Sequence, residues 1–430
     1  MSISSSLAAG VSGLNANAQR LASISDNIAN SSTFGYKRSF TDFNALVTNS
    51  GNASRFTAGG VSSSTLRMVD ERGQIQASSN ATDIAINGRG FLPVANYTSA
   101  ISGDPFKTAL ATTGSFRPNA AGHLVDSAGN ALLGWPASLD GSFPSFPRDA
   151  VDGLVPINIF HNQFAANPTD QMSVQLNLPS VDSDPTSLGG PHDIALEYFG
   201  NQGQTHILNF EFTPTGTDNE WTVQITDSDS GGAVIGEYTM EFSDSPTGGG
   251  TLASVTTVSG GVYVPSYGII PLTTGSGGMI DIDIGRLGEA GGITQLDSGF
   301  SPSLLSKNGS PVGILQGVEI DEGGIIQAIY DSGFTRPIYQ VPVIDVANPN
   351  GLVPGDGQSF GISLESGSIF LWDAGQGPVG ETLGFAREAS SVDVAQELTQ
   401  LIQTQRAYSS NAKIIQTVDE MLQETTNLKR

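Results

Sequence analysis

Both ends of the chain carry apolar residues at alternating steps of four and three positions. Six of the eight positions 3, 7, 10, 14, 17, 21, 24 and 28 are apolar. They include Leu7, Leu14, Leu21, Ile24 and Ile28. This spacing is typical of a long helix that packs against other helices through a narrow stripe. Asn30 and Gly35 belong to a group of helix-breaking residues, so the helix is expected to end there.

The C-terminal segment repeats this pattern. Seven of nine positions between 394 and 422 are apolar at the same alternating steps. These are Val394, Leu398, Leu401, Tyr408, Ala412, Ile415 and Leu422. Ser390 or Ser391 is expected to cap this helix, and Asp393 suits the positive end of its dipole, with Lys429 and Arg430 at the other end. Each stripe alone is compatible with a helix lying on its own domain, but two stripes at the two ends favour a coaxial helix pair.

Between the two helices, the apolar residues follow the period of β-strands. Asn87-Gly88 lies between two short apolar runs, and Ser127–Asn130 lies between two more, as in β-hairpins. Residues 317–344 contain three apolar runs separated by turn-forming Asp and Gly residues. Strand-like alternation also occurs at residues 171–178, 205–212 and 221–226. The middle of the chain is therefore predicted to be an antiparallel β protein.

The order of these patterns predicts a nested, mainly β protein of the α+β class, with paired terminal helices and two antiparallel β domains. We expect an inner helical domain of residues 1–30 with 391–430, a connecting segment of 31–70 with 361–390, a middle β domain of 71–161 with 298–360, and an inserted acidic outer β domain of 162–297. The narrow stripes on long helices predict that packing within one chain does not bury them completely.

The charge of the chain is strongly negative and unevenly placed. Asp and Glu number 42 against 18 Lys and Arg, which gives a net charge of −24. No Lys or Arg occurs between Asp149 and Gly285. Such a surface repels nucleic acid and anionic lipid, so neither is an expected partner. The pairs Asp182/Asp184, Asp227/Asp229 and Asp281/Asp283 leave cation binding open, but none has the ligand spacing of an EF-hand loop.

The sequence contains no recognisable catalytic or cofactor-binding pattern. There is no Cys, and no two of the four His residues lie three or four positions apart, so the usual metal-ligand spacings are missing. A pair of carboxylates could still act as in a glycosidase, which leaves a β-rich hydrolase as one alternative. No apolar run is long enough to cross a bilayer, and the N-terminus lacks the positive region of a cleaved secretory signal. We therefore expect no membrane insertion, and either a cytoplasmic chain or export with the N-terminus retained.

Three groups of motifs resemble the flagellar rod–hook axial protein family. The first is Asn27-Ile28-Ala29-Asn30-Ser31-Ser32-Thr33-Phe34-Gly35-Tyr36-Lys37. The second contains Gln405-Arg406-Ala407-Tyr408 and Asn411-Ala412-Lys413 near the C-terminus. The third, in the middle of the chain, contains Asn80-Ala81-Thr82-Asp83 and Gly88-Arg89-Gly90-Phe91. Together with their flanking matches they cover about half the chain, both ends included.

This resemblance implies a structural protein and not an enzyme. The length and the β-rich insertion are similar to those of hook-type members, whereas rod-type members are shorter. Such a chain would assemble with itself into a tubular helical polymer that joins rod and filament and transmits torque. The resemblance also implies contacts with rod, hook-cap and hook–filament junction proteins, export by the flagellar type III apparatus, and a location in the extracellular hook and basal body. Another member of the family, or a secreted adhesin, remains the alternative.

The cluster Tyr36, Lys37 and Arg38 raises a separate question, because cations are scarce in this chain. It follows the predicted end of the first helix, within the segment that leads to the β domains. We expect Asn30, Thr33, Gly35, Tyr36, Lys37 and Arg38 to form this linker. Our hypothesis is that Lys37 and Arg38 pair with acidic groups of a neighbouring subunit. The alternative is a solvated linker whose charges contact nothing.

Overall fold

A computed structural model describes residues 3–46, 59–102, 107–138 and 141–427. It divides the chain into two compact units, each of which is treated separately below. Unit 1 comprises Met1–His161, Val318–Ala328 and Arg336–Arg430, and unit 2 comprises Asn162–Gly317 and Ile329–Thr335. Lys429 and Arg430, which we expected at the end of the last helix, lie outside the described residues, as do 47–58 of the predicted connecting segment.

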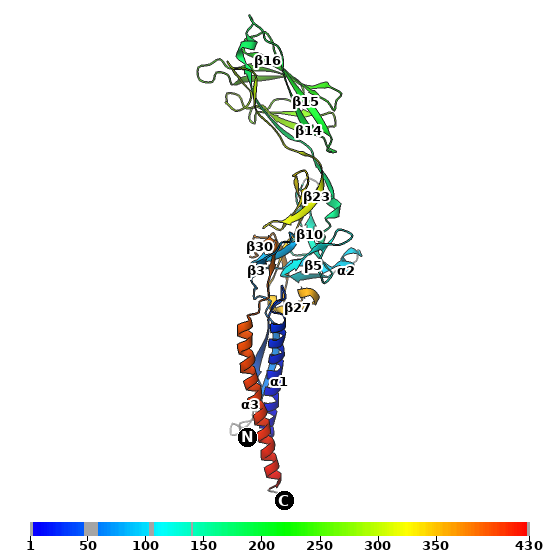
Figure 1. Cartoon of the computed structure of the whole chain (residues 1–430), viewed down its shortest axis with the longest axis vertical. Coiled ribbons are helices and arrows are strands. Elements are labelled where there is room, and N and C mark those ends of the chain that lie inside the picture. The colour runs from blue at the N-terminus through cyan, green and yellow to red at the C-terminus, as the bar shows by residue number, and fades with distance from the viewer. Residues whose placement is uncertain (1–2, 47–58, 103–106, 139–140, 428–430) are drawn as a thin grey trace. The chain divides into compact units, whose positions relative to one another are not determined.

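Two long helices lie side by side in unit 1, as the stripes predicted (Figure 1). Helix α1 spans Ile3–Ala29 and helix α3 spans Val394–Asn427. The start of α3 differs from the prediction. The Asp393 carboxylate accepts the N–H groups of the second and third helical residues, so Asp393 is the cap. The prediction of a serine cap is wrong, because the Ser391 hydroxyl instead accepts the backbone N–H of Arg38 in the other linker.

A β-hairpin that the sequence did not predict lies along α1. Strands β1 (Ser39–Ala45) and β2 (Val61–Arg67) pair in antiparallel register over their whole length. The hydroxyl oxygens of Ser23 on α1 and Thr41 on β1 lie 2.7 Å apart. At the base of the hairpin, the buried Asn27 amide exchanges two hydrogen bonds with the main chain of β1. Part of the surface of α1 is therefore covered by polar contacts from its own chain.

The other described strands of unit 1 belong to one large sheet and three small ones. Part of the large sheet has the order β25-β10-β5-β6-β28-β27, where β25 spans Thr335–Gln340, and β11 and β9 also pair with β10 and β8 with β9. The small sheets are β30-β4-β7, β3-β31 and β26-β29. The strands are β3 (Ile75–Ala77), β4 (Asp83–Asn87), β5 (Leu92–Asn96), β6 (Thr108–Ala111), β7 (Thr113–Ser115), β8 (Arg117–Pro118), β9 (Leu124–Val125), β10 (Asn130–Pro136), β11 (Val155–Pro156), β26 (Val343–Val346), β27 (Val353–Pro354), β28 (Ser359–Gly361), β29 (Ile369–Trp372), β30 (Glu381–Gly384) and β31 (Ala386–Glu388). Short helices of the described residues are α2 (Tyr97–Ile101) and the 3-10 helices Phe160–Asn162, Pro349–Gly351 and Asp356–Gln358, with a further 3-10 helix, Ser180–Ser183, in unit 2. A core that includes Phe91, Trp135 and Phe360 holds the larger sheet together.

One of the two predicted hairpins of this region is not formed. Strands β4 and β5, on either side of Asn87-Gly88, pair with different partners in different sheets. Gly88 has a φ of 128°, and a Cβ atom there would lie 2.8 Å from the Cα atom of Gly380. Because it has no side chain, Gly88 can lie close to the backbone of Gly380, where the chain passes from the sheet of β4 to the sheet of β5. The hairpin around Ser127–Asn130 is confirmed, since β9 and β10 pair across it.

Three strands fall where the pattern of residues 317–344 predicted them. They are β23 (Ser310–Ile320), β24 (Ile325–Tyr330) and β25 (Thr335–Gln340). The first turn is closed by a hydrogen bond from the N–H of Asp321 to the carbonyl of Ile325. The chain passes between the two units along these three strands.

Unit 2 is a β sandwich with an apolar core. One sheet has the order β14-β15-β16-β17-β18, and the other has the order β19-β20-β13-β21 with β22 also paired to β13. The strands are β12 (Phe164–Asn167), β13 (Gln171–Pro179), β14 (His192–Phe199), β15 (Thr205–Pro214), β16 (Glu220–Asp227), β17 (Ala233–Phe242), β18 (Leu252–Ser259), β19 (Ile269–Thr273), β20 (Met279–Asp283), β21 (Thr294–Leu296) and β22 (Ser301–Lys307). Alternate residues of both sheets, such as Val174, Phe210 and Trp221, fill the space between them.

Strand β13 departs from the predicted antiparallel arrangement, because its pairings with β20 and β21 are parallel. Its alternating pattern correctly predicted a strand but carried no information about the direction of its partners. Unit 2 also includes β22, which lies beyond residue 297, where we expected the acidic insertion to end. The four-part division of the chain stays a proposal.

Candidate functional site

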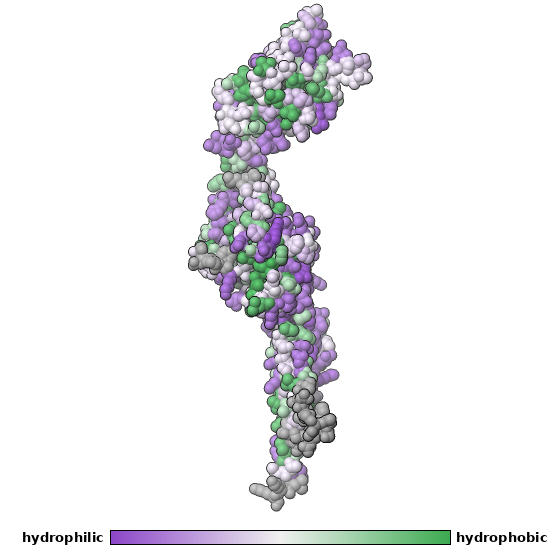
Figure 2. Space-filling model, turned by 180° about the vertical axis from the view of Figure 1, so that it is seen from behind, coloured by the Kyte–Doolittle hydropathy of each residue, from purple (hydrophilic) through white to green (hydrophobic). Residues whose placement is uncertain are grey.

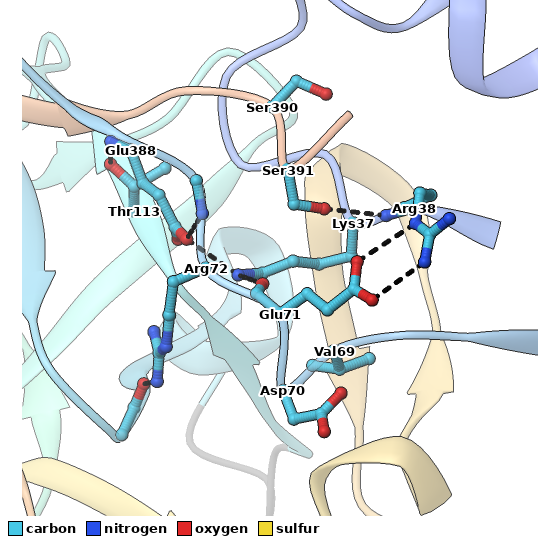
Figure 3. Close-up of polar contacts among 12 residues, drawn as sticks. Lys37, Arg38, Val69, Asp70, Glu71, Arg72, Thr113, Glu388, Ser390 and Ser391 are labelled. Atoms are coloured by element: carbon cyan, nitrogen blue, oxygen red, sulfur yellow. Dashed lines mark hydrogen bonds and ion pairs between the residues drawn. The ribbon is translucent and has the colours of Figure 1, made fainter. Parts of the chain in front are cut away.

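Two linkers, one after α1 and one before α3, run together where the helices meet the strands of unit 1. The N–H of Gly35 donates to the carbonyl of Glu388 at 2.8 Å, and the N–H of Ser391 donates to the carbonyl of Tyr36 at 3.0 Å. Gly35 has a φ of 72°, a conformation that favours glycine. We call the charged cluster around these linkers the junction; it consists of Lys37, Arg38, Glu71, Glu388 and Glu397. Figure 3 shows polar contacts of this cluster.

Lys37 and Glu388 form a buried ion pair at the centre of the junction. The Nζ atom lies 2.8 Å from Oε1, and the two side chains are only 1% and 2% exposed. The same ammonium group donates to the carbonyl of Glu71 at 2.8 Å, and the same carboxylate oxygen accepts the N–H of Gly73 at 2.7 Å. Burial lowers the pKa of Lys37, and the Glu388 carboxylate opposes that change. The pair thereby joins both linkers to the loop that precedes β3.

Arg38 connects α3 to the same loop. Its Nε and Nη2 atoms donate to the two carboxylate oxygens of Glu71 at 3.1 and 2.9 Å. Its Nη1 atom lies 3.5 Å from Oε1 of Glu397, a buried side chain in the first turn of α3. The hydrogen bonds to Glu71 raise the pKa of Arg38 above its ordinary value. A planar guanidinium is well suited to hold two carboxylates from different elements at once.

Tyr36 fixes the end of α1 to the linker. Its hydroxyl lies 2.8 Å from Oδ2 of Asp26 and 3.1 Å from Oδ1 of Asn27, and its ring is buried. The guanidinium of Arg67 on β2 lies 5.0 Å from the centre of that ring. Burial, together with the hydrogen bond to Asp26, raises the pKa of Tyr36 to about 12. The hairpin, the helix end and the linker thus share this one aromatic side chain.

The turn that ends α1 is built by the remaining predicted linker residues. The Asn30 amide donates to the carbonyl and the carboxylate of Asp26 at 2.9 and 3.0 Å. The Thr33 hydroxyl donates to the side-chain oxygen of Asn30 at 3.2 Å, and its carbonyl accepts the N–H of Tyr36. These short-range bonds reverse the chain direction and bring Tyr36 back onto the helix end.

The expected partners of Lys37 and Arg38 therefore lie in the same chain. Both cations are paired with carboxylates of unit 1. Our hypothesis that these contacts are made with acidic groups of a neighbouring subunit is therefore wrong. The alternative of a solvated linker is also wrong. Glu71 and Glu388 were not singled out from the sequence, because the loop and the C-terminal linker gave no periodic pattern that could place them beside residue 37.

The buried face of α1 coincides only in part with the stripe that the sequence predicted. The most buried positions of α1 are Gly10, Gly13, Ala16, Asn17, Ile24 and Asn27. A Cβ atom on Gly13 would lie 2.9 Å from the side chain of Asn411, and one on Gly10 would lie 3.3 Å from Ile415. Of the predicted apolar residues, Ile24 is buried, whereas Leu7, Leu14, Leu21 and Ile28 are only partly buried. Small residues bring the helices close together and turn these larger side chains toward the edge of the contact.

Helix α3 keeps most of its predicted stripe exposed. Its buried residues are Glu397, Thr404 and Val418, while Leu401 and Ile415 are partly buried. Val394, Leu398, Tyr408, Ala412 and Leu422 are exposed, as is the neighbouring Ile402. On the face of the molecule in Figure 2, apolar residues recur between polar ones along the helical part of unit 1. Packing within this chain thus leaves apolar side chains of α3 without cover.

The residues of the C-terminal family motif divide between the two faces of α3. Asn411 is partly buried and lies against Gly13 of α1. Gln405 and Arg406 are exposed. No contact of the described chain explains why the last two belong to the motif.

The acidic pairs of unit 2 do not gather into a metal site. In the described parts of the chain, no three His, Asp or Glu side chains lie close enough together to hold a metal ion. Asp182 instead contacts the ring of His192 at 2.8 Å. Asp227 is completely buried and accepts hydrogen bonds from Tyr198 and from backbone N–H groups. Among the helices of the described residues, none is long and apolar enough to cross a membrane.

Comparisons with known proteins match both the helical ends and the whole chain. Residues 7–37 match the family described as "Flagella basal body rod protein", and residues 384–428 match "Flagellar basal body rod FlgEFG protein C-terminal". The flagellar hook protein FlgE of Rhizobium meliloti is 33% identical over the full length of both chains. The chain belongs to the flagellar hook protein family.

Two further matches have lower sequence identity. The hook protein FlgE of Salmonella typhimurium is 28% identical and covers 97% of this chain and 98% of its own length. A solved structure, the crystal structure of Helicobacter pylori flagellar hook protein FlgE2, is 13% identical with a TM-score of 0.46. It covers 71% of this chain and 98% of its own length. The family assignment agrees with the resemblance carried by the terminal and central motifs of the sequence.

Proposed function

We propose that this chain is the structural subunit of a flagellar hook and assembles with itself into a tubular helical polymer. The observation that carries the proposal is the apolar stripe of α3 that its own chain leaves exposed. Val394, Leu398 and Ile402 are 40%, 47% and 52% exposed within three turns of one helix. A contiguous exposed apolar surface marks a site of association, and copies of the same chain supply matching helices.

In this proposal the inner helical domain of residues 1–30 with 391–430 forms the wall of the tube. Leu7, Leu14, Leu21 and Ile28 of α1, partly buried in one chain, would be completed by helices of neighbouring copies. Because an apolar stripe gains stability only when it is covered, the helices would order fully on assembly. The entropy lost when the helices order would also make association of free chains unfavourable before they reach the growing end of a polymer.

The junction would be the part of each subunit that transmits torque between the inner helices and the β domains. Lys37, Arg38 and three carboxylates tie both linkers to the loop at residues 68–73. A buried network of this kind resists small displacements, because moving one member leaves another charge unpaired at low dielectric. Bending of the polymer would then take place at contacts between copies, where the acidic outer domain offers a hydrated surface.

The partners and the location follow from the family and are part of the same proposal. Rod, hook-cap and hook–filament junction proteins would contact the ends of the polymer, and the flagellar type III apparatus would export the chain without a cleaved signal. The subunit would act outside the cell as a flexible joint between rod and filament, and would carry out no catalysis. Another axial-family member, such as a distal rod or junction subunit, is the alternative, and an adhesin is a weaker one.

The test is negative-stain electron microscopy of the purified chain at high salt. The full-length chain is compared with a version that lacks residues 1–30 and 394–430 and with the double variant Leu398→Asp, Ile402→Asp. We expect tubes from the full-length chain only, because the exposed stripe supplies the contacts between copies. Since both substituted side chains are exposed, the double variant should keep the circular dichroism of the wild type.

Two results would argue against the proposal. Tubes formed by the truncated version would place the assembly contacts outside the helices. Monodisperse particles from the full-length chain would remove self-assembly as a property of this chain and favour the alternatives. Gln403→Asp, on the same helix but outside the apolar stripe, is the matched control for the added charge.

A further inference from the structure

Leu364 is the most exposed large apolar side chain of the described residues. It is 103% exposed, which means that none of the other described residues covers it. The residue lies in the turn that follows β28, far along the sequence from both terminal helices. Single exposed leucines are common on protein surfaces. What sets this one apart is the rigidity of the turn that carries it and the groove beside it.

The turn around Leu364 is held by hydrogen bonds on both sides. The Ser363 hydroxyl accepts the N–H groups of Glu365 and Ser366 at 3.0 and 3.2 Å and donates to the carbonyl of Gly351 at 2.5 Å. The completely buried Ser366 hydroxyl accepts the N–H of Ser363 at 3.0 Å and donates to its carbonyl at 2.8 Å. The backbone that carries the leucine is therefore held in place, so docking of this turn into a partner would lose little backbone conformational entropy.

A groove of about 630 Å³ lies next to this turn. Its lining includes Leu66, Arg67, Val353, Pro354, Leu364 and Glu365, and we call it the Leu364 groove. Leu66 and Val353 are 49% and 56% exposed, so the apolar wall is also uncovered. The two sides of the groove are tied together, because the Asn350 side chain accepts the backbone N–H of Val69 at 2.8 Å. A preformed groove with an apolar floor and a projecting leucine fits the description of a protein docking site.

We propose that the Leu364 groove binds a second copy of this chain, as a contact additional to those of the terminal helices. The inference rests on the proposed function, because it assumes that copies of the chain come together at high local concentration. It assigns an anchor to the β domain of unit 1, a part of the chain that the apolar stripes of the helices do not include.

Two features of the groove favour a copy of the same chain as its occupant. The rim carries one cation, Arg67, and one carboxylate, Glu365, so it suits a surface that carries both signs of charge, as unit 1 of this chain does. The groove is also continuous with the helical part of unit 1. Arg67 lines it and at the same time contacts the ring of Tyr36 and the carboxylate of Asp26 at the end of α1. A neighbour that packs on this end of α1 would therefore lie close to the groove.

The absence of cysteine in this chain allows a direct test. Leu364→Cys in the full-length chain introduces one thiol at an exposed position, which should leave the fold unchanged. We expect the rate of its reaction with a maleimide to fall about tenfold when tubes form, because the centre of a packed interface excludes solvent. A benzophenone maleimide attached to the introduced thiol should, on irradiation, yield a cross-linked product of twice the mass of the chain. Leu188→Cys, at an exposed leucine of unit 2, is the matched control for access of the reagent to the polymer.

The outcomes separate this inference from the proposed function. If tubes form but the thiol of the Leu364→Cys variant reacts as fast as before and gives no cross-link, the groove is not an interface, while the self-assembly proposal stands. If the wild-type chain forms no tubes, the proposed function fails, and cross-linking of concentrated chain in solution then decides the inference. A product that joins position 364 to a different flagellar protein, and never to this chain, would overturn it as well.

Discussion

The Nζ atom of Lys37 lies 2.8 Å from Oε1 of Glu388, although 351 positions separate the two residues along the chain. This contact joins the segment that leaves α1 to the segment that enters α3. Both side chains are shielded from water, so each has lost its hydration and depends on the other. The junction therefore holds the two ends of the chain together. The buried charges of Lys37 and Glu388 fix the terminal helices to the β strands of unit 1, and water cannot replace either charge as a partner.

Removing one member of this pair should destabilise unit 1 strongly. We expect Glu388→Gln to lower the free energy of unfolding by about 3–5 kcal/mol, because it leaves the buried ammonium of Lys37 without a counter-charge. Urea unfolding followed by the fluorescence of Trp135 and Trp372, both in unit 1, measures the change. The double variant Lys37→Met, Glu388→Gln should recover part of the loss.

The control for this prediction is a pair of the same chemistry on the surface. Glu289 and Arg286 lie 3.8 Å apart with side chains 62% and 51% exposed. Glu289→Gln should therefore change stability by less than about 1 kcal/mol. Equal effects of the two Glu→Gln substitutions would mean that the buried pair contributes nothing special to the junction.

A second prediction concerns the backbone next to the pair. A Cβ atom on Gly73 would lie 1.9 Å from the carbonyl oxygen of Ala389, which is too close for any side chain. We expect Gly73→Ala to push the two linkers apart and to cost about 1–3 kcal/mol, as overpacking does in cores. Thermal unfolding of the variant measures this loss. Gly190→Ala is the matched control, because nothing lies within 4 Å of its Cβ position; an equally large effect there would contradict the explanation.

Much of this architecture could be predicted from local patterns. The two heptad stripes predicted α1 and α3, and strand-like alternation predicted β13, β15 and β16. What the patterns could not supply is which face of each helix meets the other. The close contact is made by Gly10 and Gly13, and glycine contributes no hydrophobic signal to a periodicity. The stripe that the leucines predicted is therefore left for other contacts.

The junction shows a second limit of prediction from sequence. Scarce positive charge at residues 37 and 38 correctly drew attention to this linker, since cations in an acidic chain need an explanation. Their partners come from a loop at residue 71 and a linker at residue 388. Neither segment has a period, and ion pairing between distant segments leaves no mark on either one. Because the sequence showed no partner for Lys37 and Arg38 within the chain, we placed their acidic partners on another subunit.

Tyr36 should make the stability of unit 1 depend on alkaline pH. Burial and the hydrogen bond to Asp26 raise its pKa to about 12, whereas an exposed tyrosine has a pKa of about 10. A group whose pKa is raised by folding stabilises the folded state below its unfolded pKa, and that contribution is lost as the pH rises from about 10 to about 12.

Tyr36→Phe should therefore lower stability by about 1 kcal/mol near pH 8, because the buried hydroxyl loses its hydrogen bonds. It should also make the decline of stability above about pH 10 less steep than in the wild type. Urea unfolding at a series of pH values measures both effects. Tyr267→Phe, at a position that is 67% exposed, is the control substitution. A variant with the same alkaline slope as the wild type would show that Tyr36 is not responsible.

Asp227 should make unit 2 sensitive to acid in the opposite sense. Burial by itself would raise the pKa of this carboxyl group. Hydrogen bonds from the N–H groups of Gly275 and Asp229, and from the hydroxyls of Tyr198 and Ser230, outweigh burial and hold the pKa below its ordinary value. A carboxylate with a lowered pKa stabilises the folded state above its unfolded pKa of about 4, and the contribution is lost as the pH falls through the folded value.

We therefore expect Asp227→Asn to cost about 2 kcal/mol at pH 7, since hydrogen bonds to a charged acceptor are replaced by weaker ones and the new amide group would face N–H donors. The difference from the wild type should shrink as the pH falls below about 4, because the wild-type carboxylate is then protonated first in the unfolded chain and, at lower pH, in the folded protein. Fluorescence of Trp221, in the core of unit 2, follows the transition. Asp218→Asn, at an exposed position, is the matched control. A cost that stays constant from pH 7 to about pH 3 would show that packing, and not the charge of Asp227, holds the loop after β16.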